Sequence, residues 1–101
     1  MTSTEFMTNW LREAKSLYFF LPDGPYGRPF DNMYSFQSLS AEGNSVAILL
    51  SDGIMLRFLG GITFEDRHTK LIITGFQELE FSVQGRIVSS YEGGEVTLTR
   101  F

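Results

Sequence analysis

Residues 46–59, with the sequence VAILLSDGIMLRFL, decide the fold class because they predict a β-hairpin inside an antiparallel sheet. The first strand of this hairpin is apolar on both faces, with Val46, Ile48 and Leu50 on one face and Ala47 and Leu49 on the other. Asp52-Gly53 follows, and this pair favours a tight turn because a type I′ turn needs positive φ at both central residues. We therefore expect a buried, central strand with an antiparallel partner at residues 54–59.

Outside this hairpin, a side-chain pattern with a period of two, the period of a β-strand, runs through residues 33–101. Turn sequences interrupt it at intervals typical of all-β folds. These turns are Glu42 to Asn44, Gly60-Gly61, Asp66 to Thr69 and Glu92 to Glu95. No helical pattern lies between the apolar segments, which excludes a parallel βαβ architecture. We expect an antiparallel meander of about six to eight strands, either barrel-like or a two-layer sandwich.

The N-terminal segment has helical periodicity instead. Thr2 and Glu5 have the spacing of a capping box, in which each side chain bonds the other residue's backbone amide. Apolar residues then recur at spacings of three and four: Phe6, Met7, Trp10, Leu11, Ala14, Leu17 and Tyr18. Pro22 disfavours helical backbone at Leu21, so we expect a helix over about residues 2–19. The prediction is a single α+β, β-rich domain, residues 1–101, with this amphipathic helix packed on the sheet.

Composition limits the classes of function. A chain of 101 residues is long enough for one domain with its own core. A net charge of −4 argues against a nucleic-acid partner, since affinity for phosphate comes from clustered Lys and Arg. The chain has no apolar run long enough to span a membrane, and its N-terminus lacks the basic and apolar regions of a secretory signal. We expect a soluble, cytoplasmic protein without a nucleic-acid or membrane partner.

The inventory of reactive side chains is short. The chain contains no cysteine and a single histidine, His68, which falls in a polar turn and is expected at the surface. The common catalytic triads and transition-metal sites therefore lack the residues they need. Gly60-Gly61 and Gly93-Gly94 do not have the spacing of a phosphate-binding loop. We expect no metal and no cofactor.

Residues 21–32, LPDGPYGRPFDN, are the stretch that capping, periodicity and simple turns do not explain, and they hold all three prolines. Aromatic rings offer flat apolar surface at low entropic cost, and an arginine fork suits a carboxylate or phosphate. The residues predicted to bind a protein partner or a small ligand are Asp23, Tyr26, Arg28, Phe30, Asp31 and Asn32. The function predicted from this loop is that of a non-enzymatic interaction or ligand-binding module.

Two other interpretations of the loop stay open. In the first, the loop is a rigid clamp whose rings pack into the core and whose Arg28 pairs with Asp23 or Asp31. In the second, Asp23, Asp31 and Arg28 line the pocket of a small hydrolase or isomerase, which requires them within hydrogen-bond reach of one substrate.

Size and charge allow a further class of function. An acidic chain of this length fits an inhibitor or immunity-type protein that binds a basic partner, with affinity that falls as salt rises. Homo-oligomerisation is also open, because 15% of the residues are aromatic and we expect an edge strand near residues 96–101 that could pair with a second copy across a two-fold axis.

Overall fold

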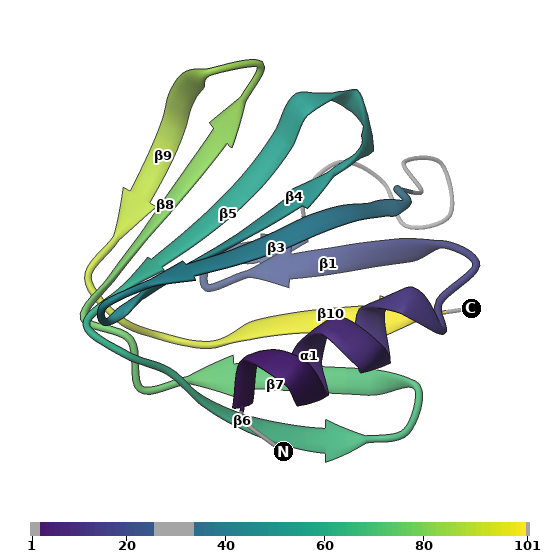
Figure 1. Ribbon diagram of the computed structural model, residues 1–101. Coiled ribbons are helices and arrows are strands. Elements are labelled where there is room, and N and C mark those ends of the chain that lie inside the picture. Colours follow the sequence, from purple (N-terminus) through teal and green to yellow (C-terminus); the bar gives the residue numbers. More distant parts are fainter. Residues whose placement is uncertain (1–2, 26–33, 101) are drawn as a thin grey trace.

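The computed structural model describes residues 3–25 and 34–100, which form one helix and two five-stranded antiparallel sheets (Figure 1). The first sheet, here the β10 sheet, has the spatial order β2 (Gly24–Pro25), β1 (Leu17–Leu21), β10 (Val96–Arg100), β7 (Lys70–Thr74) and β6 (Thr63–Arg67). The second, the β5 sheet, has the order β3 (Phe36–Glu42), β4 (Ser45–Leu50), β5 (Ile54–Leu59), β8 (Glu78–Val83) and β9 (Arg86–Tyr91). The predicted α+β, β-rich class is confirmed.

The hairpin predicted at residues 46–59 is present as β4 and β5, which pair from Val46↔Phe58 to Leu49↔Met55. A short 3-10 turn, η1 (Ser51–Gly53), connects them, and both turn residues have positive φ: 63° at Asp52 and 72° at Gly53. β5 is the middle strand of its sheet, and β4 lies between β5 and β3. The predicted turn and strand pairing therefore agree with the tertiary structure here. Only Ile48 and Leu50 of β4 are buried, and the opposite face is partly exposed, so the predicted burial of this strand on both faces is wrong.

The helix is shorter than predicted. α1 spans Ser3–Arg12, whereas the prediction was about 2–19, and Thr2 lies outside the described residues. Residues 17–21, read as the end of the helix and the start of the loop, form β1, which pairs with β10 from Leu17↔Arg100 to Phe20↔Thr97. This segment is continuously apolar and aromatic, a composition that suits a strand, and pairing with a distant strand outweighs its weak helical spacing. The predicted number of strands, six to eight, was too low for the same reason, because β1 and the two-residue β2 come from segments assigned to helix and loop.

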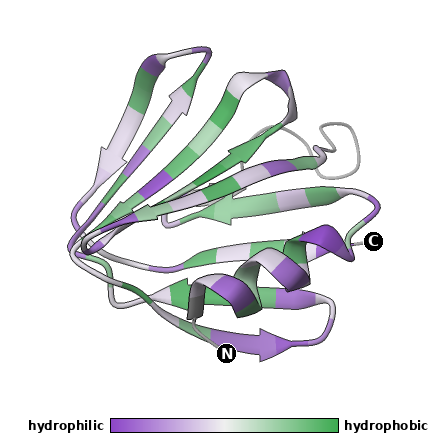
Figure 2. Ribbon diagram, in the orientation of Figure 1, coloured by the Kyte–Doolittle hydropathy of each residue, from purple (hydrophilic) through white to green (hydrophobic). Residues whose placement is uncertain are grey.

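The last strand lies inside its sheet. β10 is hydrogen-bonded to β1 on one side and to β7 on the other, so the predicted terminal edge strand at residues 96–101 is wrong for Val96–Arg100. The edge strands of the β10 sheet in the described residues are the two-residue β2 and, on the other side, β6, which is largely hydrophilic (Figure 2). Charged side chains on an edge strand discourage pairing with another chain.

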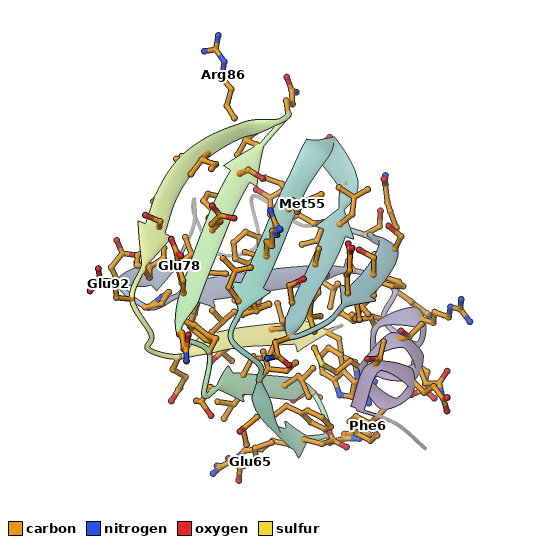
Figure 3. All side chains as sticks on the ribbon, turned by 60° about the vertical axis from the view of Figure 1, so that its left-hand side comes forward. Phe6, Met55, Glu65, Glu78, Arg86 and Glu92 are labelled. Atoms are coloured by element: carbon orange, nitrogen blue, oxygen red, sulfur yellow. The ribbon has the colours of Figure 1, made fainter. Side chains whose placement is uncertain are left out.

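The core lies between the two sheets, whose strands cross steeply (Figure 3). Phe19 of β1 joins them: its ring centroid is 5.7 Å from that of Phe81 on β8 and 5.6 Å from that of Tyr34. Tyr34 also forms an antiparallel bridge with Leu17, which connects the sheets at one corner. The barrel is not closed, and the arrangement is that of two packed layers.

α1 covers one side of this core. The ring of Phe6 stacks on Phe64 of β6 with centroids 5.0 Å apart, and the helix also contacts β3 of the other sheet. Its own residues Met7, Trp10 and Leu11 form the buried face of the helix. The predicted packing of the helix on the sheet is therefore correct. Among the described residues, no helix is long and apolar enough to cross a membrane.

Candidate functional site

The structure describes one of the six side chains predicted to form a binding loop. The other five, Tyr26, Arg28, Phe30, Asp31 and Asn32, lie outside the described residues. Asp23 is exposed in the tight turn between β1 and β2, where Leu21 pairs with Gly24. The predicted loop at residues 21–32 therefore begins as a small hairpin on the edge of the β10 sheet.

The side chain of Asp23 is hydrogen-bonded to a residue of the β5 sheet. The hydroxyl of Tyr91, at the end of β9, donates a 3.0 Å hydrogen bond to Asp23 Oδ1, and it accepts a 3.1 Å hydrogen bond from Ser89 Oγ. Burial raises the pKa of Tyr91, and the nearby Asp23 carboxylate raises it further, whereas the bond from Ser89 lowers it. In the described part of the chain, Asp23 thus contacts the end of β9 across the two sheets.

A pocket lies at the other end of β1, where α1 meets the β10 sheet. Its volume is about 250 Å³. The lining residues are Phe6, Asn9, Trp10, Glu13, Asp66 and Arg100. Phe6, Trp10 and Glu13, like Asn9 and Glu13, are three or four residues apart, so these four side chains lie on one side of the helix. Glu13 follows the last helical residue, but its N–H still donates a helical hydrogen bond to the Asn9 carbonyl. Asp66 comes from β6 and Arg100 from β10.

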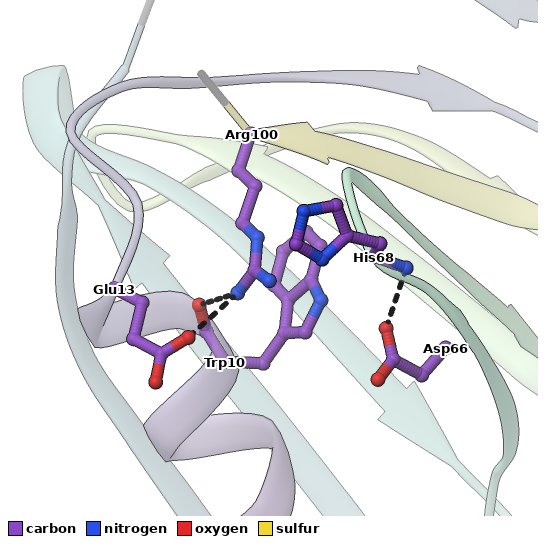
Figure 4. A network of polar contacts seen from close by, with 5 residues as sticks. All are labelled: Trp10, Glu13, Asp66, His68 and Arg100. Carbon is purple, nitrogen blue, oxygen red and sulfur yellow. Dashed lines mark hydrogen bonds and ion pairs between the residues drawn. The ribbon is translucent and has the colours of Figure 1, made fainter.

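Arg100 connects the walls of this pocket (Figure 4). Its Nη1 donates to the Trp10 carbonyl at 2.9 Å and lies 3.3 Å from Glu13 Oε2, while its Cζ lies 4.4 Å from the centroid of the Trp10 ring. The Trp10 carbonyl belongs to the last turn of α1, where backbone carbonyls lack helical partners and a cation is favourable. Arg100 thus caps the helix, and its side chain is only 15% exposed.

The indole nitrogen of Trp10 is the unusual group of the pocket. Trp10 is 4% exposed, and its Nε1 is a buried side-chain atom without a hydrogen-bond partner in the described part of the chain. A buried donor without an acceptor costs about 1–3 kcal/mol. The nitrogen lies on the side of the ring that faces Asp66 and His68 (Figure 4). Trp10, one of the lining residues, therefore carries a buried donor for which the protein supplies no acceptor among residues 3–25 and 34–100.

The acidic side chains at the rim are engaged in local contacts. Asp66 Oδ1 accepts a 2.8 Å hydrogen bond from the backbone N–H of His68, which holds His68 in a turn at φ 64°. His68 is exposed, as predicted. No group of three His, Cys, Asp or Glu side chains suited to a metal ion occurs in residues 3–25 and 34–100.

A second hollow, of about 330 Å³, lies on the outer face of the β5 sheet. Leu49, Met55 and Ile87 contribute its apolar surface, and the charged pair Arg57–Glu80, at 3.6 Å, lies at its side. A register shift in the pairing of β8 with β9 explains why the consecutive residues Ile87 and Val88 are both exposed, at 62% and 58%. This hollow is larger, but no buried polar group points to an occupant, so the pocket at Trp10 is the better candidate.

Sequence reasoning missed this pocket. The spacing of Phe6, Trp10 and Glu13 on one helix was visible, but Arg100 is 90 residues from Trp10. Nothing in the local sequence pattern indicates that β10 places Arg100 beside the helix. Comparisons of the chain with protein-family models, with curated proteins and with solved structures found no match.

Proposed function

We propose that this chain is a small, non-enzymatic ligand-binding module and that the pocket between α1, β6 and β10 is its binding site. The observation that supports the proposal is the buried indole N–H of Trp10, which has no acceptor in the described part of the chain. A bound molecule with an oxygen acceptor satisfies this donor and recovers the free energy that its burial costs. The nearby guanidinium of Arg100 favours the same kind of ligand group.

Binding suits this pocket better than catalysis. Glu13 pairs with Arg100, and Asp66 closes the turn at His68, so both carboxylates have structural partners. A nucleophile with an adjacent base, the usual arrangement for covalent catalysis, is absent from the six lining residues.

The proposal changes the location of the site but keeps the predicted class. The binding role of residues 21–32, the hydrolase or isomerase alternative and the acidic inhibitor alternative stay predictions, as do the cytoplasmic location and homo-oligomerisation. Each of the loop hypotheses depends on residues outside the described range, such as Arg28 and Asp31.

Trp10 provides a direct test, because it is the only tryptophan in the chain and gives a single indole N–H resonance. We expect members of a panel of free amino acids, carboxylic acids, amines and sugars, added separately, to shift this resonance in a saturable way. Trp10→Phe keeps an aromatic ring but removes the donor, and we expect it to weaken binding of each active compound, as measured by calorimetry.

The matched control is Glu65→Gln, on β6 beside Asp66 but outside the pocket lining, which should leave binding unchanged. Binding that leaves the indole resonance unmoved, or a panel without a single binder, would contradict the proposal.

A further inference from the structure

The polar groups of the pocket suggest a class of ligand, and this inference rests on the proposed function of the site. Two lining residues carry donors: Trp10, whose Nε1–H is buried and unpartnered in the described chain, and Arg100, whose two hydrogen-bond contacts there both use Nη1. Nε and Nη2 of Arg100 therefore keep donor capacity. A carboxylate has two oxygens and a negative charge, so it matches an indole N–H together with a guanidinium better than a neutral acceptor does.

The charge of the pocket excludes a simple anion as the best ligand. The lining carries one guanidinium, on Arg100, and two carboxylates, on Glu13 and Asp66, which leaves a formal charge of −1. Arg100 and Glu13 form an ion pair, so Asp66 is the carboxylate without a cationic partner among the lining residues. A positive charge on the ligand near Asp66 is therefore favourable, whereas a lone carboxylate adds to the negative charge.

The remaining walls are aromatic and the space is small. Phe6 and Trp10 provide apolar surface beside the polar groups. At about 250 Å³ the pocket is smaller than the roughly 300–1,000 Å³ typical of drug-sized ligands. It suits a molecule of the size of a single amino acid. Trp10 Nε1 is closed to solvent, so a ligand reaches it only when side chains at the pocket rim move.

We propose that the pocket binds a free, zwitterionic α-amino acid with an apolar side chain. Its carboxylate accepts hydrogen bonds from Trp10 Nε1 and from Arg100, its ammonium group lies near Asp66, and its side chain contacts Phe6. This arrangement satisfies the unpartnered donor and pairs the ammonium group with Asp66, and the zwitterion adds no net charge to the lining.

The test compares L-phenylalanine with three analogues, each titrated by calorimetry while the indole N–H resonance of Trp10 is followed. N-acetyl-phenylalanine lacks the ammonium charge, phenylalanine amide lacks the carboxylate, and 3-phenylpropanoate lacks the amine. We expect L-phenylalanine to bind at least about tenfold more tightly than each analogue, because each one leaves a charged group of the pocket unmatched. L-leucine, added as a second apolar amino acid, should bind in the same range.

Asp66→Asn separates the ammonium contact from the rest of the site. This exposed substitution should reduce the preference for L-phenylalanine over 3-phenylpropanoate by about tenfold, while Glu65→Gln should leave it unchanged. Equal binding of N-acetyl-phenylalanine would overturn the inference in favour of a peptide carboxyl terminus, and equal binding of the amide would overturn the role of the carboxylate. In both cases a shifted indole resonance would still support the proposed site. If no compound of this set or of the wider panel shifts that resonance, the proposed function fails as well.

Discussion

The guanidinium of Arg100 stacks over the ring of Trp10 at 4.4 Å and donates a 2.9 Å hydrogen bond from Nη1 to the carbonyl of the same residue. One side chain of β10 thus caps the last turn of α1 and covers the face of its largest aromatic ring. The backbone of Arg100 is itself fixed, because its N–H donates to the Thr69 carbonyl at 2.9 Å and its position pairs with Leu17. This contact holds the helix against the β10 sheet and forms one wall of the pocket.

Removing the Arg100 guanidinium should loosen the helix. Arg100→Met keeps much of the apolar stem but loses the charged hydrogen bond and the stacking, for which we expect a loss of about 2–3 kcal/mol in the free energy of unfolding. Urea denaturation of the purified variant measures this loss. Glu13→Gln is the control: its side chain is 72% exposed, so breaking only the ion pair should cost less than about 0.5 kcal/mol. Equal losses in both variants would show that the ion pair, and not the cap, stabilises the helix.

The link between Asp23 and Tyr91 predicts two opposite pKa changes. Asp23→Asn removes the negative charge beside the phenol and should lower the pKa of Tyr91, whereas Ser89→Ala removes a donor to the phenol oxygen and should raise it. Titration of the tyrosine Cζ resonances by NMR measures both changes. Shifts in the same direction in the two variants would contradict the observed geometry.

The raised pKa of Tyr91 also predicts a loss of stability at high pH. The folded state binds the phenol proton more tightly than the unfolded chain, whose tyrosine has the ordinary value of 10.0. The stabilisation is therefore complete below about pH 10 and is lost as the pH rises through the higher folded-state pKa. Unfolding free energies measured on both sides of pH 10 should fall less steeply in Tyr91→Phe than in the unmodified protein. An identical slope would mean that Tyr91 does not contribute.

The adjacent glycines between β5 and β6 separate steric from conformational effects. Gly60 and Gly61 have almost the same positive φ, 88° and 90°, so alanine is strained at each by about 1–2 kcal/mol. A Cβ at Gly60 would lie 2.6 Å from Gln77 Cγ and 2.8 Å from Gln77 Cβ, whereas a Cβ at Gly61 meets nothing within 4 Å. We expect Gly60→Ala to lower the melting temperature clearly more than Gly61→Ala. Equal decreases would show that Gln77 moves away without cost.

Neighbouring phenylalanines on β1 test the contact between the sheets. Phe19 is 1% exposed and its ring meets those of Tyr34 and Phe81, so Phe19→Ala should cost about 3–5 kcal/mol in unfolding free energy. Phe20 points to the opposite face and is 36% exposed, and Phe20→Ala should cost less than about half as much. Urea denaturation compares the two. A larger loss at Phe20 would place residues 17–21 in a different register.

Features that depend on neighbouring residues could be predicted from the sequence. The hairpin of β4 and β5 was predicted because the side-chain alternation and the Asp52-Gly53 turn are both local, and the structure has positive φ at both turn residues. The alternating strand at residues 78–83 was also predicted correctly, with Leu79 and Phe81 buried. His68 lies in an exposed turn, as its polar neighbours indicated.

Residues 17–21 show where local patterns were insufficient. Leu17 and Tyr18 continued the helical spacing of the preceding residues, yet Leu17, Phe19 and Leu21 are buried with the period of a strand. The hydrogen bonds that decide between these two states come from β10, about 80 residues further along the chain. The extent of the helix and the number of strands were wrong for this reason.

The sequence by itself determined an antiparallel, β-rich domain with one amphipathic helix, because alternation, helical spacing and turn residues act over a few positions. Only the tertiary structure decided that β10 lies between β1 and β7 and that the two sheets pack across a shared core. The candidate site depends on the tertiary structure, because Trp10 and Arg100 become neighbours only when the last strand takes its place in the sheet beneath the helix. Pairing between strands distant in sequence is set by the total free energy of burial and hydrogen bonding, which no local pattern contains.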